Sequence, residues 1–226
     1  NTDRNRKSSL SVFNIYLLRH GELVQSGILC GRSDIALSDT GKHQLIKATQ
    51  NLPEISYCYS SPLLRCREFA ERYCQQQGLS LQVLAELQEM NFGDWDGKSY
   101  QALWQIATPD GEVAPEPQLT LGNFWQDPWQ CQPPNGESMA SFTARVDHFW
   151  QHLLARLSQA HQKKTDSSNS LVFSHGGVIR YLLAKVLGLP IPGTYHMTNL
   201  DVPYGGLIHL QVAIDDNGNA WPKLML

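Results

Sequence analysis

The sequence predicts an α/β protein, a three-layer α/β/α sandwich with a mostly parallel central sheet. Short apolar, β-rich runs at residues 13–18, 57–60 and 171–174 are typical of buried strands. Segments with helical spacing separate these runs, and such alternation favours a sheet covered by helices on both faces. The length of 226 residues favours one domain, which we place at 13–226 after a polar N-terminal tail at 1–12.

Each helix in the first half has local start and stop signals. Residues 38–51 begin with a serine cap and end before Pro53, which cannot continue a helix. Ser61 and Pro62 provide a cap and a first helical position for the next helix, which ends at Gly78.

The remaining elements follow from periodicity. Residues 81–87 alternate well enough to predict a third strand, and residues 138–161 predict the longest helix. After the strand at 171–174, residues 178–187 form a buried helix and residues 207–214 a final strand.

Residues 91–134 differ in character from the rest of the chain. They are rich in proline and glycine, with a weak helical pattern at 100–106. We interpret them as a small helical insertion over one end of the sheet. Its tryptophans are Trp95, Trp104, Trp125 and Trp129.

Composition excludes several classes of partner. The net charge is −3 and the basic residues are scattered, so neither nucleic acid nor an anionic membrane surface is expected as a partner. No apolar stretch approaches the roughly 20 residues of a membrane span, and the N-terminus is polar. Five cysteines without a C-x-x-C pair fit a reducing compartment, so we expect a cytoplasmic protein.

Two histidines follow two predicted strands. Residues 18–22 read Leu-Arg-His-Gly-Glu, and residues 173–177 read Phe-Ser-His-Gly-Gly. Open α/β folds bind ligands outside the carboxyl ends of their strands, so we expect His20 and His175 in one anion-binding site. An imidazole there can attack an electrophile, and the guanidinium of Arg19 can hold an anion.

Four segments resemble those of the histidine phosphatase superfamily, which includes the cofactor-dependent phosphoglycerate mutases. They occur in the family's order, at residues 18–22, 60–66, 87–97 and 173–180. One match would be weak, but four in order are specific, and together they span about residues 14–215. The resemblance implies a phosphoglycerate mutase-like fold and a metal-independent, acid-type histidine phosphatase without a cofactor.

A phosphate monoester is a dianion, so a site without a metal needs several fixed positive donors. We expect guanidinium forks from Arg19 and Arg65 and a ring donor from His175. His20 is the candidate nucleophile, with one nitrogen unprotonated and the other N–H held by an acceptor. The resemblance implies that His20 carries a phosphohistidine intermediate, which water then hydrolyses.

Glu89 is the candidate general acid, which protonates the leaving alcohol and then activates water. Glu86 is a close rival, and either could be an exposed carboxylate.

Further substrate contacts are expected from small and polar residues. Gly176 and Gly177 allow a close backbone approach to phosphoryl oxygens. Many relatives carry serine or threonine and then asparagine after R-H-G-E, where this chain has Leu23 and roughly Ser26. Gln25 or Ser26 therefore replaces the asparagine contact in our prediction.

No metal site is expected. A metal between His20 and His175 would be repelled by the two arginines beside it. His148 and His152 have the i, i+4 spacing of metal ligands, but no further ligand motif lies near them, which favours a solvated helix face.

Within the superfamily, residues 92–97, 135–138 and 175–180 most resemble α-ribazole phosphatases. These enzymes hydrolyse α-ribazole 5′-phosphate to α-ribazole in cobalamin nucleotide-loop assembly. The short segment after His175 favours hydrolysis over mutase transfer. A broad-specificity sugar or metabolite phosphatase, a phosphoglycerate mutase and a catalytically silent phosphate-binding module remain alternatives.

Two expectations concern surfaces. The insertion's tryptophans either fill the core or stack on an aromatic leaving group. The strand at 207–214 either presents an exposed edge that pairs with a second copy, giving a homodimer, or is covered.

Overall fold

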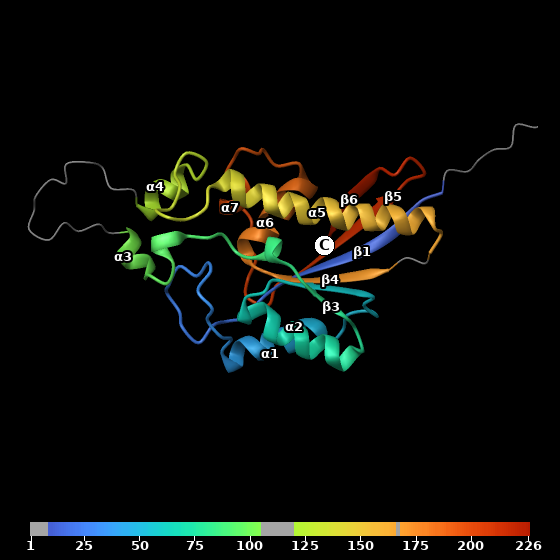
Figure 1. The fold of residues 1–226 in the computed structure, drawn as a ribbon, viewed down its shortest axis with the longest axis horizontal. Coiled ribbons are helices and arrows are strands. Elements are labelled where there is room, and N and C mark those ends of the chain that lie inside the picture. Colours follow the sequence, from blue (N-terminus) through green and yellow to red (C-terminus); the bar gives the residue numbers. More distant parts are fainter. Residues whose placement is uncertain (1–8, 105–119, 166–167) are drawn as a thin grey trace, which may run out of the picture.

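A six-stranded sheet in the order β3-β2-β4-β1-β5-β6 forms the centre of the molecule (Figure 1). The structure, a computed structural model, describes residues 9–104, 120–165 and 168–226. The strands are β1 (Ser11–Arg19), β2 (Tyr57–Ser60), β3 (Leu81–Val83), β4 (Asn169–Ser174), β5 (Leu207–Ile214) and β6 (Ala220–Met225). The first four are parallel, β5 is antiparallel to β1, and β6 is antiparallel to β5. The predicted α/β class and mostly parallel sheet are confirmed.

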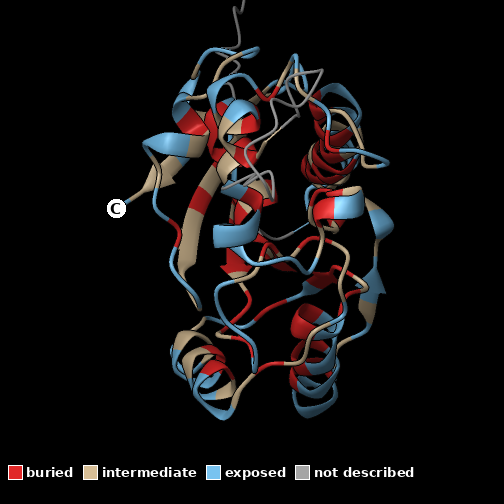
Figure 2. Cartoon of the chain, turned by 90° about the vertical axis from the view of Figure 1, so that its left-hand side faces the viewer, coloured by how far each residue is buried: buried red, intermediate tan, exposed pale blue. Residues whose placement is uncertain are grey.

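Helices cover both faces of the sheet (Figure 1). One face carries α1 (Asp39–Thr49) and α2 (Leu64–Gln77), and the other carries α5 (Met139–Gln162) and α6 (Gly176–Leu187). The alternation along β1 explains this layering. Phe13, Ile15 and Leu17 are fully buried in the cluster that includes α5 and α6. Leu18 is fully buried in the separate cluster that includes α1 and α2. Figure 2 shows the buried surfaces of these helices turned inward.

The predicted start of α1 and the predicted end of α2 are confirmed, whereas the serine cap predicted for α2 does not form. Ser38 caps α1 by accepting a hydrogen bond from the Gly41 N–H, and Ser138 caps α5 by accepting one from the Ser141 N–H. Gly78 ends α2 with a φ of 67°, a left-handed conformation that favours glycine.

Some predicted boundaries are wrong. The strand expected at 81–87 stops at Val83, because β2 has only four residues for β3 to pair with. A 3₁₀ turn (Ala85–Leu87) follows instead. The helix expected from Ser61 begins at Leu64, and the Ser61 hydroxyl accepts a hydrogen bond from the Leu63 N–H.

The expectation that residues 207–214 form the last strand is also wrong, because β6 follows and pairs with β5. Pro222 and Lys223 hide this strand from sequence analysis, since proline and charge are tolerated mainly on edge strands. The covered alternative for β5 is therefore correct. β6 forms this edge, and Pro222 removes a backbone donor there. A homodimer stays a prediction.

The described part of the predicted insertion contains short helices at one end of the sheet (Figure 1). They are α3 (Tyr100–Trp104) and α4 (Leu121–Gln126), after a 3₁₀ turn (Gly93–Trp95). A further short helix, α7 (Tyr195–Thr198), lies after α6 and was not predicted, like α4. The end of the helix predicted at 100–106 lies outside the described residues.

The N-terminal boundary is slightly different from the prediction. β1 begins at Ser11, inside the tail predicted at 1–12, and residues 1–8 lie outside the described chain. None of the described helices has both the length and the apolar character needed to cross a membrane.

Candidate active site

The two predicted histidines meet because their strands are neighbours. β1 and β4 run parallel, with Arg19 in register with Ser174, so the next residue of each strand is a histidine at the same sheet edge. The rings of His20 and His175 lie 5.3 Å apart, centroid to centroid. The predicted convergence of the two histidines is therefore what the fold produces.

His20 presents one free ring nitrogen. Its Nδ1 lies 2.8 Å from the Gly21 carbonyl oxygen, which can only accept, so Nδ1 carries the hydrogen and Nε2 keeps its lone pair. The side chain is buried, and burial together with the Arg65 and Arg19 cations lowers its pKa to about 3. The imidazole is therefore neutral over the physiological pH range.

His175 presents the opposite nitrogen. It is fully buried, and its Nε2 lies 2.8 Å from the Ser61 hydroxyl. The Ser61 oxygen accepts from the Leu63 N–H. We assign its hydroxyl as the donor to Nε2, which places the ring hydrogen of His175 on Nδ1. Burial, Arg65 and His20 lower the pKa of His175 well below its ordinary value.

The two predicted arginines are held by backbone carbonyls. Arg65 is fully buried and donates from Nη1 to the Ser33 oxygen (2.7 Å) and from Nη2 to the Gly31 oxygen (2.6 Å). Arg19 donates from Nη1 to the Val202 oxygen (2.6 Å). The backbone therefore engages part of each guanidinium, and within the described residues each arginine leaves its Nε–H unpaired.

Three buried donors of the predicted site have no hydrogen-bond partner among the described residues. They are the Arg19 Nε, the Arg65 Nε and the His175 Nδ1. Leaving a buried donor unpaired costs about 1–3 kcal/mol, which an anion bound at all three would recover. Two further atoms share this property, the Arg156 Nη1 on α5 and the His196 Nδ1 on α7.

Glu89 approaches the start of α6. Its carboxylate accepts hydrogen bonds from the Gly177 N–H (3.0 Å) and the Met90 N–H (2.9 Å). A Cβ on Gly177 would collide with this carboxylate, so Gly177 accommodates Glu89, which differs from the predicted contact with phosphate. The rival Glu86 turns toward His148, 3.3 Å away at the surface.

Of the other residues predicted to contact substrate, one lines the cavity and two do not. Gly176 lines the cavity beside Arg19. Gln25 and Ser26 are exposed on the loop before Gly27 and are not among the cavity-lining residues.

A cavity of about 140 Å³ adjoins Glu89 and Arg19. Its polar lining includes Arg180 and Tyr100, whereas most of its wall is apolar. The apolar lining residues are Leu29, Met90, Phe92, Phe124, Trp125, Met139, Phe142 and Met197. This wall suits an apolar or aromatic group attached to the phosphate.

The four tryptophans therefore have different positions. Trp125 lines the cavity, whereas Trp95 is buried in the core against Phe124. Trp129 donates to the Gly193 carbonyl oxygen, and Trp104 is 59 % exposed.

Within the described chain, no group of three or more His, Cys, Asp or Glu side chains is placed to hold a metal ion. His148 and His152 are exposed neighbours on α5, with ring centroids 4.5 Å apart.

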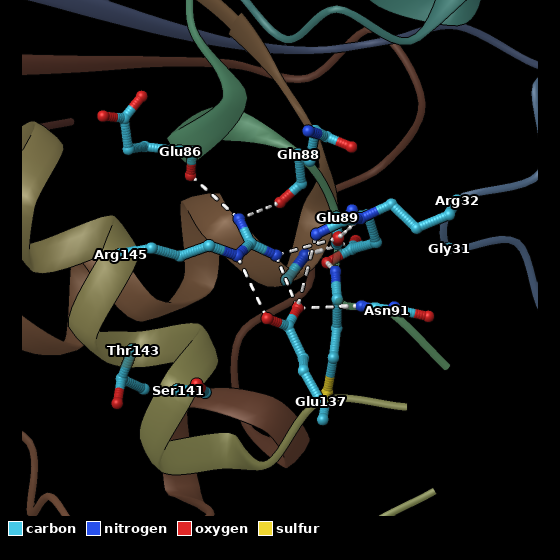
Figure 3. Close-up of polar contacts among 12 residues, drawn as sticks. Gly31, Arg32, Glu86, Gln88, Glu89, Asn91, Glu137, Ser141, Thr143 and Arg145 are labelled. Carbon is cyan, nitrogen blue, oxygen red and sulfur yellow. Dashed lines mark hydrogen bonds and ion pairs between the residues drawn. The ribbon is translucent and has the colours of Figure 1, made fainter. Parts of the chain in front are cut away.

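Sequence reasoning missed Arg145 on α5. This side chain reaches the backbone that carries Glu89 and donates to the Glu89 carbonyl oxygen at 2.9 Å (Figure 3). Arg145 is partly buried and lies at helical spacing between the buried Phe142 and Phe149 of α5. An arginine among these apolar positions is the signal that could have indicated a buried partner.

The chain belongs to the histidine phosphatase superfamily (branch 1), because residues 15–218 match the sequence model of that family. Its members are phosphatases or mutases that act on small phosphate monoesters. The protein is 31% identical over 190 residues to the adenosylcobalamin/α-ribazole phosphatase of Escherichia coli, covering 80% of this chain and 83% of that protein. It is also 27% identical to the glucosyl-3-phosphoglycerate phosphatase of Mycolicibacterium vanbaalenii, covering 80% and 77%.

Solved structures agree on the fold. The α-ribazole phosphatase from Shigella flexneri superposes with a TM-score of 0.69 at 26% identity, covering 95% of each chain. A mycobacterial hydrolase superposes with a TM-score of 0.77 at 22% identity, covering 95% of this chain and 90% of that one. At that identity the second likeness concerns the fold alone.

Proposed function

We propose that this protein hydrolyses a phosphate monoester through a phosphohistidine at His20, and that its substrate is α-ribazole 5′-phosphate. One observation carries the mechanism. The free Nε2 of His20 lies beside His175, at a site with three buried, unpaired donors. That arrangement suits a phosphoryl group with its oxygens on the donors and its phosphorus facing the nucleophile.

The first step transfers the phosphoryl group to nitrogen. The Nε2 lone pair of His20 forms a bond to phosphorus as the bond from phosphorus to the alcohol oxygen breaks. The carboxyl proton of Glu89 passes to that oxygen, so a neutral alcohol leaves and Glu89 becomes a carboxylate. Arg19, Arg65 and His175 stabilise the negative charge on the phosphoryl oxygens.

The second step returns the enzyme to its starting state. Glu89 takes a proton from water as the water oxygen bonds to phosphorus and the bond from phosphorus to His20 breaks. Inorganic phosphate leaves, Nε2 regains its lone pair, and Glu89 regains its proton. The sum is one ester and one water converted to one alcohol and one phosphate.

The cavity supports an aromatic alcohol as the leaving group. α-Ribazole carries a flat aromatic base on a ribose, and the cavity beside Glu89 is walled by Phe124, Trp125 and other apolar side chains. Two α-ribazole phosphatases among the relatives point the same way.

Two substitutions test the mechanism. His20→Ala should abolish phosphate release, because it removes the proposed nucleophile. Glu89→Gln should slow turnover by about 10²–10⁴-fold while changing vanadate inhibition little. A chelator should leave the wild-type rate unchanged. Full activity of His20→Ala would refute the phosphohistidine mechanism.

The substrate is tested by comparing phosphate release from several esters. We expect α-ribazole 5′-phosphate to be hydrolysed much faster than glucosyl-3-phosphoglycerate, 3-phosphoglycerate or p-nitrophenyl phosphate. Comparable kcat/KM values for all of them would indicate a general phosphatase. Conversion of 3-phosphoglycerate to its isomer without phosphate release would indicate a mutase.

A further inference from the structure

We propose that Arg145 is a positioning residue for Glu89, and that it acts with Glu137 as a clamp on the backbone around that carboxylate. The inference rests on the proposed role of Glu89 in proton transfer. It concerns a residue that does not itself line the cavity, but that packs on the cavity-lining Phe142 and hydrogen-bonds the backbone of Glu89.

Every N–H group of the Arg145 guanidinium donates either to the backbone of residues 86–89 or to the Glu137 carboxylate (Figure 3). Its Nη1 donates to the carbonyl oxygens of Glu86 (2.9 Å) and Gln88 (2.7 Å). Its Nη2 donates to the Glu89 carbonyl oxygen (2.9 Å) and the Glu137 carboxylate (2.6 Å), and its Nε donates to the same carboxylate (3.2 Å). All five N–H groups that arginine offers are therefore used.

Glu137 extends the clamp past Glu89. Its carboxylate accepts from the Asn91 N–H (2.8 Å), and its own N–H donates to the Asn91 carbonyl oxygen (2.9 Å). The side chains of Arg145 and Glu137 are only 19% and 15% exposed, so the pair is screened less than a surface ion pair.

A second guanidinium reaches the same carbonyl. The Arg32 Nε donates to the Glu89 oxygen (3.1 Å), and its Nη2 lies 3.9 Å from Glu137 (Figure 3). Arg32 and Arg145 thus both donate to the Glu89 carbonyl oxygen, and Glu137 lies near both guanidiniums. Together these contacts hold the Glu89 backbone in place.

The segment needs such a clamp because it has little secondary structure of its own. After β3 and the 3₁₀ turn (Ala85–Leu87), residues 88–91 belong to no helix or strand. The Glu89 carboxylate depends on two backbone N–H contacts, from Gly177 and Met90. A backbone shift of about 1 Å would break them and misplace the proton donor.

The test compares two leaving groups in single turnovers with excess enzyme. p-Nitrophenolate is weakly basic and leaves without a proton, whereas the alkoxide of 2-phenylethyl phosphate needs one. We expect Arg145→Gln to slow release of 2-phenylethanol by about 10²-fold and release of p-nitrophenol by about threefold at most. Arg145→Lys should restore little, because an ammonium cannot replace the five-donor fork.

The matched control is Arg156→Gln on the same helix. Arg156 is also half-buried and donates to the Tyr59 and Ser170 side chains, away from Glu89. Arg156→Gln should change the release of 2-phenylethanol and of p-nitrophenol by the same factor. If Arg145→Gln does not fold, as judged by circular dichroism, Glu137→Gln is the second variant, with an expected selective loss of about tenfold.

Glu89→Gln in the same assay separates the two hypotheses. If Glu89→Gln slows only the alkyl ester and Arg145→Gln and Glu137→Gln match Arg156→Gln, the clamp is overturned while the role of Glu89 stands. If Glu89→Gln shows no preference between the esters, the proposed proton transfer fails and the clamp fails with it. Equal losses on both esters in Arg145→Gln also overturn the positioning role.

Discussion

His20 and His175 are similarly buried but present opposite ring nitrogens, and single neighbouring atoms decide which. The Gly21 carbonyl oxygen holds the hydrogen of His20 on Nδ1, which leaves Nε2 as a nucleophile. The Ser61 hydroxyl occupies Nε2 of His175, which leaves Nδ1 as a donor. Because both pKa values are depressed by burial and nearby cations, neither ring gains a second proton before substrate arrives.

Ser61→Ala tests this assignment of the His175 tautomer. Without the hydroxyl, the hydrogen of His175 is free to move to Nε2, and the Nδ1 donor is lost part of the time. We expect kcat/KM and vanadate affinity each to fall by about tenfold. The control is Ser60→Ala, since the adjacent, equally buried Ser60 hydroxyl donates only to the Ser61 carbonyl oxygen. Equal effects of the two substitutions would contradict the assignment.

Different elements build the phosphate end and the cavity end of the candidate site. β1 and β4 place the two histidines, and α2 and α6 begin beside them with N-termini that favour anions. Half of the residues that line the cavity come from the described part of the insertion and from the starts of α5 and α7, and they are Phe92, Tyr100, Phe124, Trp125, Met139, Phe142, His196 and Met197. In the proposed function, the phosphate chemistry depends on the sheet, while the choice of alcohol depends on the cavity wall.

Trp125→Ala tests whether the cavity wall decides which alcohol is accepted. The half-buried Trp125 lines the cavity, so its loss should raise KM for α-ribazole 5′-phosphate by about tenfold through lost apolar contact. The rate with a small ester such as methyl phosphate should change little. Trp104→Ala, at an exposed position of α3, is the matched control. An effect on methyl phosphate as large as on α-ribazole 5′-phosphate would contradict it.

At the scale of the whole molecule, the buried site makes stability depend on pH. The pKa of His20 is lowered from its ordinary 6.5 to about 3 in the folded state, whereas the unfolded chain titrates near the ordinary value. Between these values the unfolded state binds more protons, so the free energy of unfolding falls as pH falls through that window. Above pH 6.5 this contribution is fully present.

Urea unfolding at a series of pH values measures this dependence. Wild-type protein should lose stability steadily from about pH 7 to about pH 4, and His20→Gln should lose less over the same interval because it removes one such proton. Circular dichroism of both proteins at each pH gives the midpoints. Parallel curves for the two proteins would show that His20 is not held neutral by the fold.

Much of this molecule was predictable from local patterns. The strands at 57–60 and 207–214 have the predicted bounds, and both histidines lie at the predicted sheet edge. Strand-end motifs are predictable because parallel neighbours bring successive carboxyl ends together, whatever packs around them. β6 escaped prediction because Pro222 and Lys223 contradict strand propensity, which pairing with β5 overrides.

By itself, the sequence determined the α/β class, the order of β1, β2, β4, β5 and the long helices between them, and the meeting of two histidines at one sheet edge. Only the tertiary structure decided which nitrogen each histidine presents, how Arg19 and Arg65 are held, and that Arg145 grips the segment of Glu89. The physical reason is range. Strand and helix signals act between residues a few positions apart, whereas Arg145 and Glu89 are 56 positions apart. Their contact exists only because α5 packs against the 3₁₀ turn (Ala85–Leu87) that precedes Glu89.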